Sequence, residues 1–306
     1  MNDNTPNTAT DKSSSNATNA NTGQISSPLW FPELSPGGDG QGFIEKGTRH
    51  SLMFVKRLRP VLLVSFDNLS NVSDDSPGRV PWGFKFAKDQ SVSHLGVFAH
   101  GKLWYRDPNL IARMQELANS GFFDGYERVV FTGSSMGAFA ALVFASLVPG
   151  SHVMAFNPQS TLDPQLVPWE ERYWIGRRQD WSLPLSDAQG ILENCGPVSV
   201  FYDPYFEPDH KHFERLQGQN VTPYKCWFSN HKSAVFLRKL DALKPLMYEG
   251  LFGQITPAIF YDLYRARRNL PWYVGSLEKY FRESGREGMA ELARTSYRRH
   301  KRAQQE

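Results

Sequence analysis

Short apolar segments recur through the middle of the chain and indicate strands. Residues 60–66, 94–99 and 128–132 each form a run of β-branched, aromatic and other apolar side chains bounded by turn residues. Such runs are typical of strands that are buried on both faces, as in a parallel sheet. Three more runs of the same kind are predicted to be strands: residues 152–156, 198–202 and 224–228.

Helical patterns lie between these strands. Asp107-Pro108 is a helix start, because aspartate accepts from the free N–H groups of a first turn and proline fits its first position. Residues 138–145 form a helix that is apolar nearly all round, and residues 210–216 and 233–246 also have a helical pattern. The alternation of strands and helices predicts the α/β class: one doubly wound, mostly parallel sheet with helices on both faces.

The two ends of the chain differ from this middle part. Residues 1–28 are mostly Asn, Thr, Ser, Asp and Ala. They bury too little apolar surface to offset the entropy of ordering, so we expect a disordered tail. The main domain is expected to span residues 29–281, with an irregular, aromatic-rich insertion at about 157–184. Residues 282–306 carry seven basic side chains against four glutamates and predict a basic helix or tail.

Composition and charge narrow the class of partner. The chain has 306 residues, of which 40% are hydrophobic, and a net charge of +3. The apolar fraction is enough for a large core, and so small a positive excess does not favour a nucleic-acid partner. Because most of the excess falls in residues 282–306, that segment is expected to contact an acidic partner such as acidic lipid or a polyanion. The alternative is an ordinary solvated helix face.

The expected cofactors and cellular compartment are inferred from patterns that the sequence lacks. Cys195 and Cys226 are the only cysteines, and neither sits in a metal-ligand or C-x-x-C pattern. A disulfide framework and a zinc site are therefore not expected. No apolar run approaches the roughly 18 residues of a membrane span, and the N-terminus lacks a secretory signal, so we expect a cytoplasmic protein. No nucleotide-binding glycine pattern occurs either, and no cofactor is predicted.

The candidate chemistry lies in Gly133-Ser134-Ser135-Met136-Gly137, a G-x-S-x-G pattern centred on Ser135. A buried strand precedes the pattern and an apolar helix follows it. This strand–turn–helix context distinguishes a nucleophile turn from a chance match of the pattern. A sharp turn there lifts the serine hydroxyl above the sheet, and side chains at positions 133 and 137 would collide. The helix start then directs the Met136 N–H at the space beside Oγ, where negative charge develops during acyl transfer. The alternative is a turn without chemistry.

With this motif and strand pattern, the chain from about residue 60 to 246 resembles the α/β-hydrolase superfamily. The resemblance implies a mostly parallel, eight-stranded sheet and a triad of nucleophile, acid and histidine in that chain order. It also implies an oxyanion hole that takes a second backbone N–H from the loop after an earlier strand. Here that loop has Asp67-Asn68 in place of the His-Gly common in the family, so Asp67 or Asn68 is expected to supply this donor.

The resemblance places the general base at His231, just beyond the last predicted strand and directly before a helix. The acid is expected in the loop after residues 198–202, where Asp203 and Asp209 are both candidates. Asp203 is slightly favoured, because the end of a strand is held more rigidly. The alternatives are a turn before Pro204 for Asp203 and a helix N-cap for Asp209.

Together these residues predict a serine hydrolase of the esterase or thioesterase type, acting through an acyl-enzyme on Ser135. The expected substrate is a small-molecule or glycan ester. One alternative is an acyltransferase or deacylase acting on a glycan, with the aromatic insertion sheltering the acyl-enzyme from water. A second alternative is a catalytically silent hydrolase-fold protein that only binds.

Overall fold

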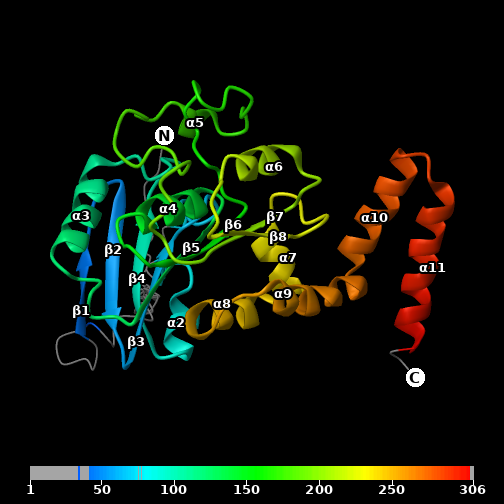
Figure 1. The fold of residues 1–306 in the computed structure, drawn as a ribbon, viewed down its shortest axis with the longest axis horizontal. Helices are drawn as coiled ribbons and strands as arrows, with labels where there is room; N and C mark the ends of the chain where they lie inside the picture. Colours follow the sequence, from blue (N-terminus) through cyan, green and yellow to red (C-terminus); the bar gives the residue numbers. More distant parts are fainter. Residues whose placement is uncertain (1–33, 35–40, 75, 77, 304–306) are drawn as a thin grey trace, which may run out of the picture.

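One sheet of eight strands forms the centre of the computed structural model, which describes residues 34, 41–74, 76 and 78–303 (Figure 1). In order across the sheet the strands are β1 (Gln41–Glu45), β2 (His50–Lys56), β4 (Val92–Ala99), β3 (Arg59–Phe66), β5 (Arg128–Ser134), β6 (His152–Phe156), β7 (Val198–Tyr202) and β8 (Val221–Lys225). The pairs β1–β2 and β2–β4 are antiparallel, and every other neighbouring pair is parallel.

Helices cover both faces of this sheet. In chain order the helices with described bounds are α2 (Phe84–Asp89), α3 (Pro108–Asn119), α4 (Met136–Ala145), α5 (Trp174–Arg177), α6 (Glu207–Glu214), α7 (Ser233–Lys239), α8 (Leu243–Phe252), α9 (Pro257–Tyr264), the 3-10 helix η1 (Arg265–Asn269), α10 (Pro271–Glu283) and α11 (Glu287–Ala303). Helices α3 and α4 pack into the core on one face, and α7, α8 and α9 pack into the core on the other. The predicted doubly wound α/β class is confirmed.

Strand β3 shows why its sequence is apolar at successive positions. Leu62, Val64 and Phe66 belong to the core under α3 and α4. The alternating residues Val61 and Leu63 belong to the core under α7, α8 and α9. Because successive side chains of a strand point to opposite faces, a strand covered on both sides is apolar at nearly every buried position.

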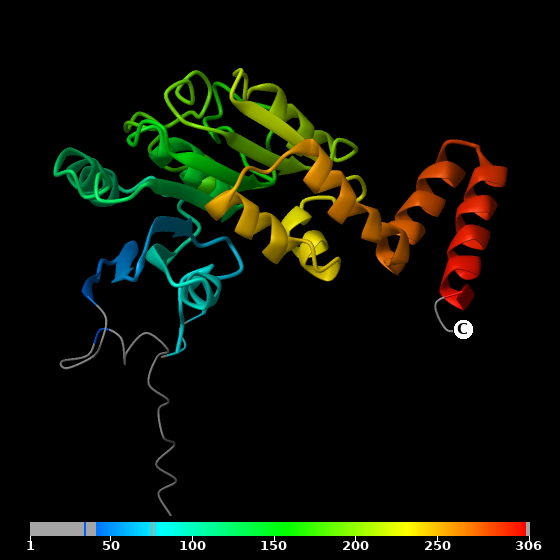
Figure 2. The same ribbon diagram turned by 60° about the horizontal axis from the view of Figure 1, so that its bottom comes forward.

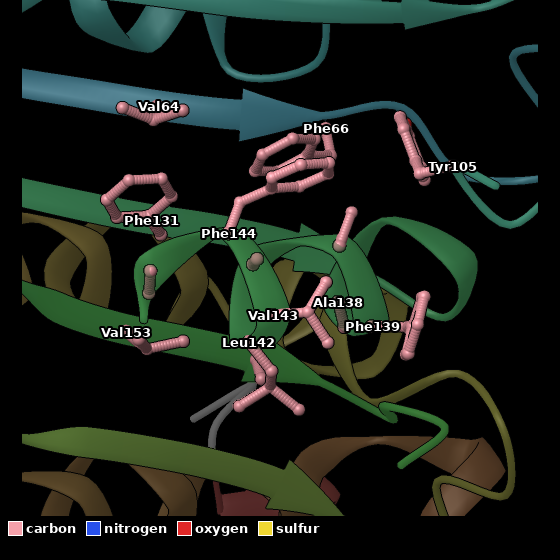
Figure 3. Close-up of a cluster of buried hydrophobic side chains, with 14 of the residues drawn as sticks. Val64, Phe66, Tyr105, Phe131, Ala138, Phe139, Leu142, Val143, Phe144 and Val153 are labelled. Atoms are coloured by element: carbon pink, nitrogen blue, oxygen red, sulfur yellow. The ribbon is translucent and has the colours of Figure 1, made fainter. Parts of the chain in front are cut away.

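Helix α4 is buried along its whole length and carries the candidate nucleophile at its start. All ten of its residues are buried. Figure 3 shows its apolar side chains between strands β3, β5 and β6, with Phe144 over Phe66. These two rings stack with centroids 5.5 Å apart and planes within 10°. Such packing fixes the helix start relative to the end of β5, as a preorganised site requires.

Several predicted elements have different bounds in the structure, and the helix predicted at 210–216 is α6, Glu207–Glu214. The last predicted strand, residues 224–228, is displaced to β8, which includes Pro223 and ends at Lys225. Proline is tolerated there because β8 lies at the edge of the sheet, and a positive φ of 62° at Phe228 turns the chain away. The helix predicted at 233–246 is divided into α7 and α8, because Asp241 between them has a φ of 56°.

The segment between β6 and β7 contains α5 but no other helix or strand, and it follows the surface above the sheet (Figure 1). The side chain of Arg106 binds this segment through hydrogen bonds to its backbone. Its guanidinium is buried and donates to the carbonyl oxygens of Leu183, Pro184 and Leu185 at 2.6, 2.9 and 2.7 Å. Its Nε also donates to the Asp180 carbonyl at 3.3 Å, so four carbonyls around one cation order this irregular chain.

Helices α10 and α11 form a hairpin that projects from the body, which Figure 2 shows from a second direction. We call this hairpin the C-terminal arm. Within the described residues, no helix combines the length and the apolar character needed to cross a bilayer. The tail predicted at residues 1–28 lies outside the described residues.

Candidate active site

Ser135 stands at a sharp turn between β5 and α4. Its backbone has a φ of 55° and a ψ of −118°, a conformation that non-glycine residues rarely adopt. The turn is held by a 2.8 Å hydrogen bond from the Ser135 N–H to the Phe156 carbonyl. A strained backbone that its surroundings maintain is typical of functional positions, and it leaves the Ser135 side chain only half-buried.

The two glycines of the motif are sterically required. A Cβ on Gly133 would lie 2.3 Å from the carbonyl carbon of Gly137. A Cβ on Gly137 would lie 2.5 Å from the carbonyl oxygen of Phe66. Both obstacles are backbone atoms, which cannot move without displacing the start of α4 or the end of β3.

Replacing Gly137 with alanine is therefore expected to lower the free energy of unfolding by about 3 kcal/mol. Urea unfolding followed by circular dichroism measures the change. The matched control is Gly275→Ala in α10, where an added Cβ meets nothing within 4 Å. The control is expected to leave stability unchanged or to raise it by up to about 1 kcal/mol. Equal stability of Gly137→Ala and wild type would show that the elbow is not tightly packed.

His231 lies between Ser135 and a carboxylate. Its Nε2 is 2.8 Å from Ser135 Oγ, and its Nδ1 is 2.8 and 2.9 Å from the two carboxylate oxygens of Asp209. Because an ionised carboxylate only accepts hydrogen bonds, the ring proton sits on Nδ1 and leaves Nε2 free to accept from the serine hydroxyl. This is the tautomer that a general base needs.

Asp209 comes from the first turn of α6, and its side chain has no solvent exposure. Besides His231, its carboxylate accepts from Asn157 Nδ2 at 2.8 Å and from Arg172 at 3.1 Å. Burial by itself raises the pKa of this carboxyl. The hydrogen bond and charge of His231, followed by the charge of Arg172, outweigh burial and hold the pKa below its usual value. The carboxylate is therefore ionised at neutral pH.

Arg172 is itself oriented by a buried acid. Glu170 pairs with Arg172 and accepts from His212 Nε2 at 3.0 Å. Burial raises the pKa of Glu170, but hydrogen bonds from His212 and Arg172 and the arginine's charge bring that pKa down to about 2. A fixed negative charge at Glu170 aligns Arg172 toward Asp209. The segment between β6 and β7 thus contributes to the electrostatics of the site.

Of the two candidate acids, Asp209 lies beside the imidazole, whereas the slightly favoured Asp203 binds loop backbone. The Asp203 carboxylate accepts from the backbone N–H groups of Tyr205 at 3.0 Å and Asn230 at 2.8 Å. Asp203 therefore ties the loop after β7 to the loop that carries His231. The rigid strand end points this carboxylate at the loop backbone, whereas the first turn of α6 brings Asp209 to the imidazole.

Tyr173 also contacts the candidate base, and sequence analysis gave it no role at the site. Its hydroxyl is 2.9 Å from His231 Nε2. Burial raises the pKa of Tyr173 to about 12, so the phenol is protonated and donates. The single lone pair of Nε2 is therefore shared between the hydroxyls of Tyr173 and Ser135. Only the aromatic density of the insertion hinted at this residue in the sequence.

The expected oxyanion donors lie on two elements. Met136 is the first residue of α4, where an N–H has no acceptor within the helix. The N–H of Asn68 points at Asn71 Oδ1 over a long 3.4 Å. The N–H of Asp67 donates to the Val97 carbonyl at 3.2 Å. Of the two backbone N–H groups expected from this loop, that of Asp67 is therefore bonded to strand β4, and that of Asn68 faces a side chain.

No protein-family model and no curated protein matches the sequence. Solved structures are similar in fold. A capsule O-acetyltransferase of Neisseria meningitidis serogroup A is 12% identical, over 64% of this chain and 90% of that chain, with a TM-score of 0.45. An esterase of Pyrococcus furiosus is 14% identical over 69% and 90%, with a TM-score of 0.46. An esterase of Mycobacterium marinum is 16% identical over 74% and 81%, with a TM-score of 0.45.

Similarity at this level does not bear on activity. The chain has an α/β-hydrolase-type fold, with its mostly parallel sheet of eight strands, the turn at Ser135 after β5 and the helix α4 behind it.

Proposed function

We propose that the protein is a serine acyl-transfer enzyme that hydrolyses esters or thioesters. The observation that carries this proposal is the chain of contacts from Ser135 Oγ through His231 to Asp209, at 2.8 Å on each side of the imidazole. A hydroxyl, a base and an orienting carboxylate at these distances are the parts that nucleophilic acyl transfer needs. The order serine, acid, histidine along the chain fits the α/β-hydrolase pattern.

In the acylation step, Ser135 Oγ attacks the carbonyl carbon while its proton passes to His231 Nε2. The carbonyl electron pair moves onto the oxygen, which lies beside the Met136 N–H at the positive end of α4. Asp209 stabilises the imidazolium through Nδ1. The tetrahedral intermediate then collapses, and His231 gives its proton to the departing alcohol or thiol.

In the deacylation step, His231 takes a proton from water, and the resulting hydroxide attacks the acyl carbon. Collapse of the second intermediate returns the proton from His231 to Ser135 Oγ and frees the acid. The Tyr173 hydroxyl lies within reach of the same nitrogen. The attacking water and the departing alcohol must hydrogen-bond to this nitrogen. The Tyr173 hydroxyl therefore has to move away from it during turnover.

Turnover of p-nitrophenyl esters from acetate to octanoate tests this proposal, with p-nitrophenolate release followed by absorbance. We expect release above the spontaneous rate, with a maximum at one acyl length that reflects the acyl pocket. If no ester in the series, and no acyl thioester, is turned over by folded protein, the proposal is wrong. That result would instead favour the catalytically silent binding protein.

A second candidate is transfer of the acyl group to a glycan hydroxyl. The observation that favours it is the aromatic cover of the site: Tyr173 packs on Trp104 with ring centroids 4.8 Å apart, and its hydroxyl reaches His231. Such a cover keeps water from the acyl-enzyme. Incubation with an acyl donor and a glycan, followed by mass spectrometry, distinguishes the two. Transfer adds one acyl mass to the glycan, whereas hydrolysis releases only free acid.

We also propose an anionic lipid surface as the acidic partner of the C-terminal arm. From residue 292 to 303, α11 carries five basic side chains and no acidic one: Arg294, Arg298, Arg299, Lys301 and Arg302. Met289 and Leu292 on the same helix are 46% and 59% exposed. Cations together with exposed apolar side chains on one helix suit the interface of an acidic membrane. A cytoplasmic location stays a prediction from the sequence.

Replacing Arg294, Arg298 and Arg299 with alanine is expected to weaken binding to vesicles that contain phosphatidylserine by about 100-fold. Each juxtamembrane cation contributes about 1 kcal/mol at low salt. Vesicle co-sedimentation measures the change, and ester turnover in solution should not alter. A control variant removes the same charge from exposed lysines on the body: Lys56, Lys102 and Lys225. Equal binding by the two variants, or no binding by wild type, would contradict the proposal.

A further inference from the structure

A buried glutamine points its amide at the candidate nucleophile. Gln159 lies in the loop after β6 and has no solvent exposure. Its Nε2 is 3.4 Å from Ser135 Oγ. On the other side, its Oε1 accepts from the indole Nε1 of Trp104 at 3.1 Å. Sequence analysis did not single out this residue, because a glutamine in a loop without periodicity gives no signal.

Trp104 determines which way the amide faces. An indole N–H can only donate, so the glutamine atom next to it must be the oxygen. The NH2 group is therefore directed at Ser135, and this orientation follows from chemistry and not from a choice between two similar atoms. Trp104 itself is 1% exposed and has a φ of 47°. A Cβ on Gly176 of α5 would lie 2.4 Å from its ring, so the indole is closely packed.

In the loop after β3, the two backbone N–H groups expected as donors both face acceptors within the protein. The Asp67 N–H is bonded to the Val97 carbonyl, and the Asn68 N–H faces Asn71 Oδ1. The Asp67 carbonyl also accepts from the Tyr105 hydroxyl at 2.7 Å. These contacts hold the loop in its present shape. A second donor for a negative oxygen beside Ser135 is therefore more readily supplied from Gln159.

We propose that the Gln159 side-chain amide stabilises the oxyanion together with the Met136 N–H. This inference rests on the proposed acyl transfer. When Ser135 Oγ attacks, its proton passes to His231 and the carbonyl electron pair becomes a negative charge on the substrate oxygen. The negative substrate oxygen is bonded to the carbon that Oγ attacks. It therefore comes within reach of the Gln159 amide, whose Nε2 lies 3.4 Å from Oγ before substrate binds. On collapse, the electron pair reforms the carbonyl and the leaving group takes the proton from His231.

Burial makes such a donor effective. A hydrogen bond to a developing charge is stronger where water is excluded, and an amide already oriented by Trp104 needs no reorganisation at the moment of reaction. A neutral amide also leaves the ionisation of His231 and Asp209 undisturbed. Trp104 acts only through the amide, so it is a positioning residue.

Gln159→Met tests the proposal, because methionine has a similar length but lacks the donor. We expect kcat to fall about 100-fold for every ester in the p-nitrophenyl series, with KM within about threefold of wild type. The rate of labelling by a fluorophosphonate should fall in parallel, because that probe also develops a negative oxygen. A change in the preferred acyl length at unchanged kcat would instead make Gln159 a pocket wall and overturn the proposal.

Gln159→Glu keeps the shape of the side chain and its bond to Trp104, so it serves if the methionine variant is unstable. An ionised glutamate repels the oxyanion, whereas a protonated one donates to it. The activity of this variant relative to wild type is therefore expected to rise as pH falls. Relative activity that is independent of pH would contradict the proposal. Trp104→Phe, which releases the amide, should cause a smaller loss, about 10-fold, in kcat.

These outcomes are separable from failure of the proposed function. If wild type neither turns over esters nor reacts with fluorophosphonate, the acyl-transfer proposal itself is wrong. If wild type is active and the folded Gln159→Met and Gln159→Glu variants match its kcat, only the role of Gln159 is wrong.

Discussion

Replacing Ser135 with alanine is expected to reduce kcat/KM for p-nitrophenyl esters by at least about 10⁴-fold. The hydroxyl is the atom that forms the acyl-enzyme, and no other nucleophile is positioned on His231 Nε2 except the phenol of Tyr173 among the described residues. The missing Oγ should leave the fold intact, because its hydrogen bonds within the described part of the chain are to His231 and Gln159 of the site. Initial rates at saturating and low ester concentration provide the measurement.

The matched control is Ser134→Ala, one residue earlier in the same turn. Ser134 is the last residue of β5 and pairs with Phe156 of β6. We expect its activity to stay within about threefold of wild type. If Ser135→Ala keeps the activity of the control, the hydrolysis comes from another group or another protein.

Asp209→Asn should lower kcat by about 10⁴-fold, the second large effect that the site predicts. The carboxylate keeps the ring proton on Nδ1, and an amide no longer enforces that tautomer. With the proton on Nε2, the imidazole cannot accept from Ser135. The variant is expected to fold, because Arg172 retains its pairing with Glu170.

Asp203→Asn is the comparison that separates the two acids. In asparagine an NH2 group takes the place of one carboxylate oxygen, so one of the two backbone N–H groups bound by Asp203 loses its acceptor. We expect the free energy of unfolding to fall by about 1 to 2 kcal/mol. Its kcat should stay within about 10-fold of wild type. Thermal unfolding and ester turnover of both variants give the answer. A larger loss of kcat in Asp203→Asn than in Asp209→Asn would return Asp203 to the role of triad acid.

The sequence predicted the central strands well, but it did not predict the two strands at the antiparallel end of the sheet. Strands β3 and β5 are covered on both faces, so their apolar runs are unmistakable. Strands β1 and β2 were not predicted. The residues of β1 are exposed or half-buried, which leaves almost no apolar pattern to detect. Strand β2 is buried along most of its length, but its apolar run is short and is flanked by charged residues.

The candidate site was predictable where chemistry coincides with a turn. Ser135 could be recognised from the glycines that its turn requires, and His231 from its place after the last strand. The donors and charges around them come from the irregular segment between β6 and β7, whose sequence has neither a helical nor a strand pattern. Asn157, Gln159 and Arg172 of this segment contact the site. Only coordinates show which polar side chains of such a segment converge.

The central claim is that Ser135 is an activated nucleophile, and labelling by a fluorophosphonate probe tests it most directly. Wild-type protein is incubated with the probe, digested, and the modified peptide is sequenced by mass spectrometry. We expect one stoichiometric adduct on Ser135, formed far more slowly in a His231→Ala variant. Folded wild-type protein that stays unlabelled, or an adduct on a different residue that forms equally fast without His231, would contradict it.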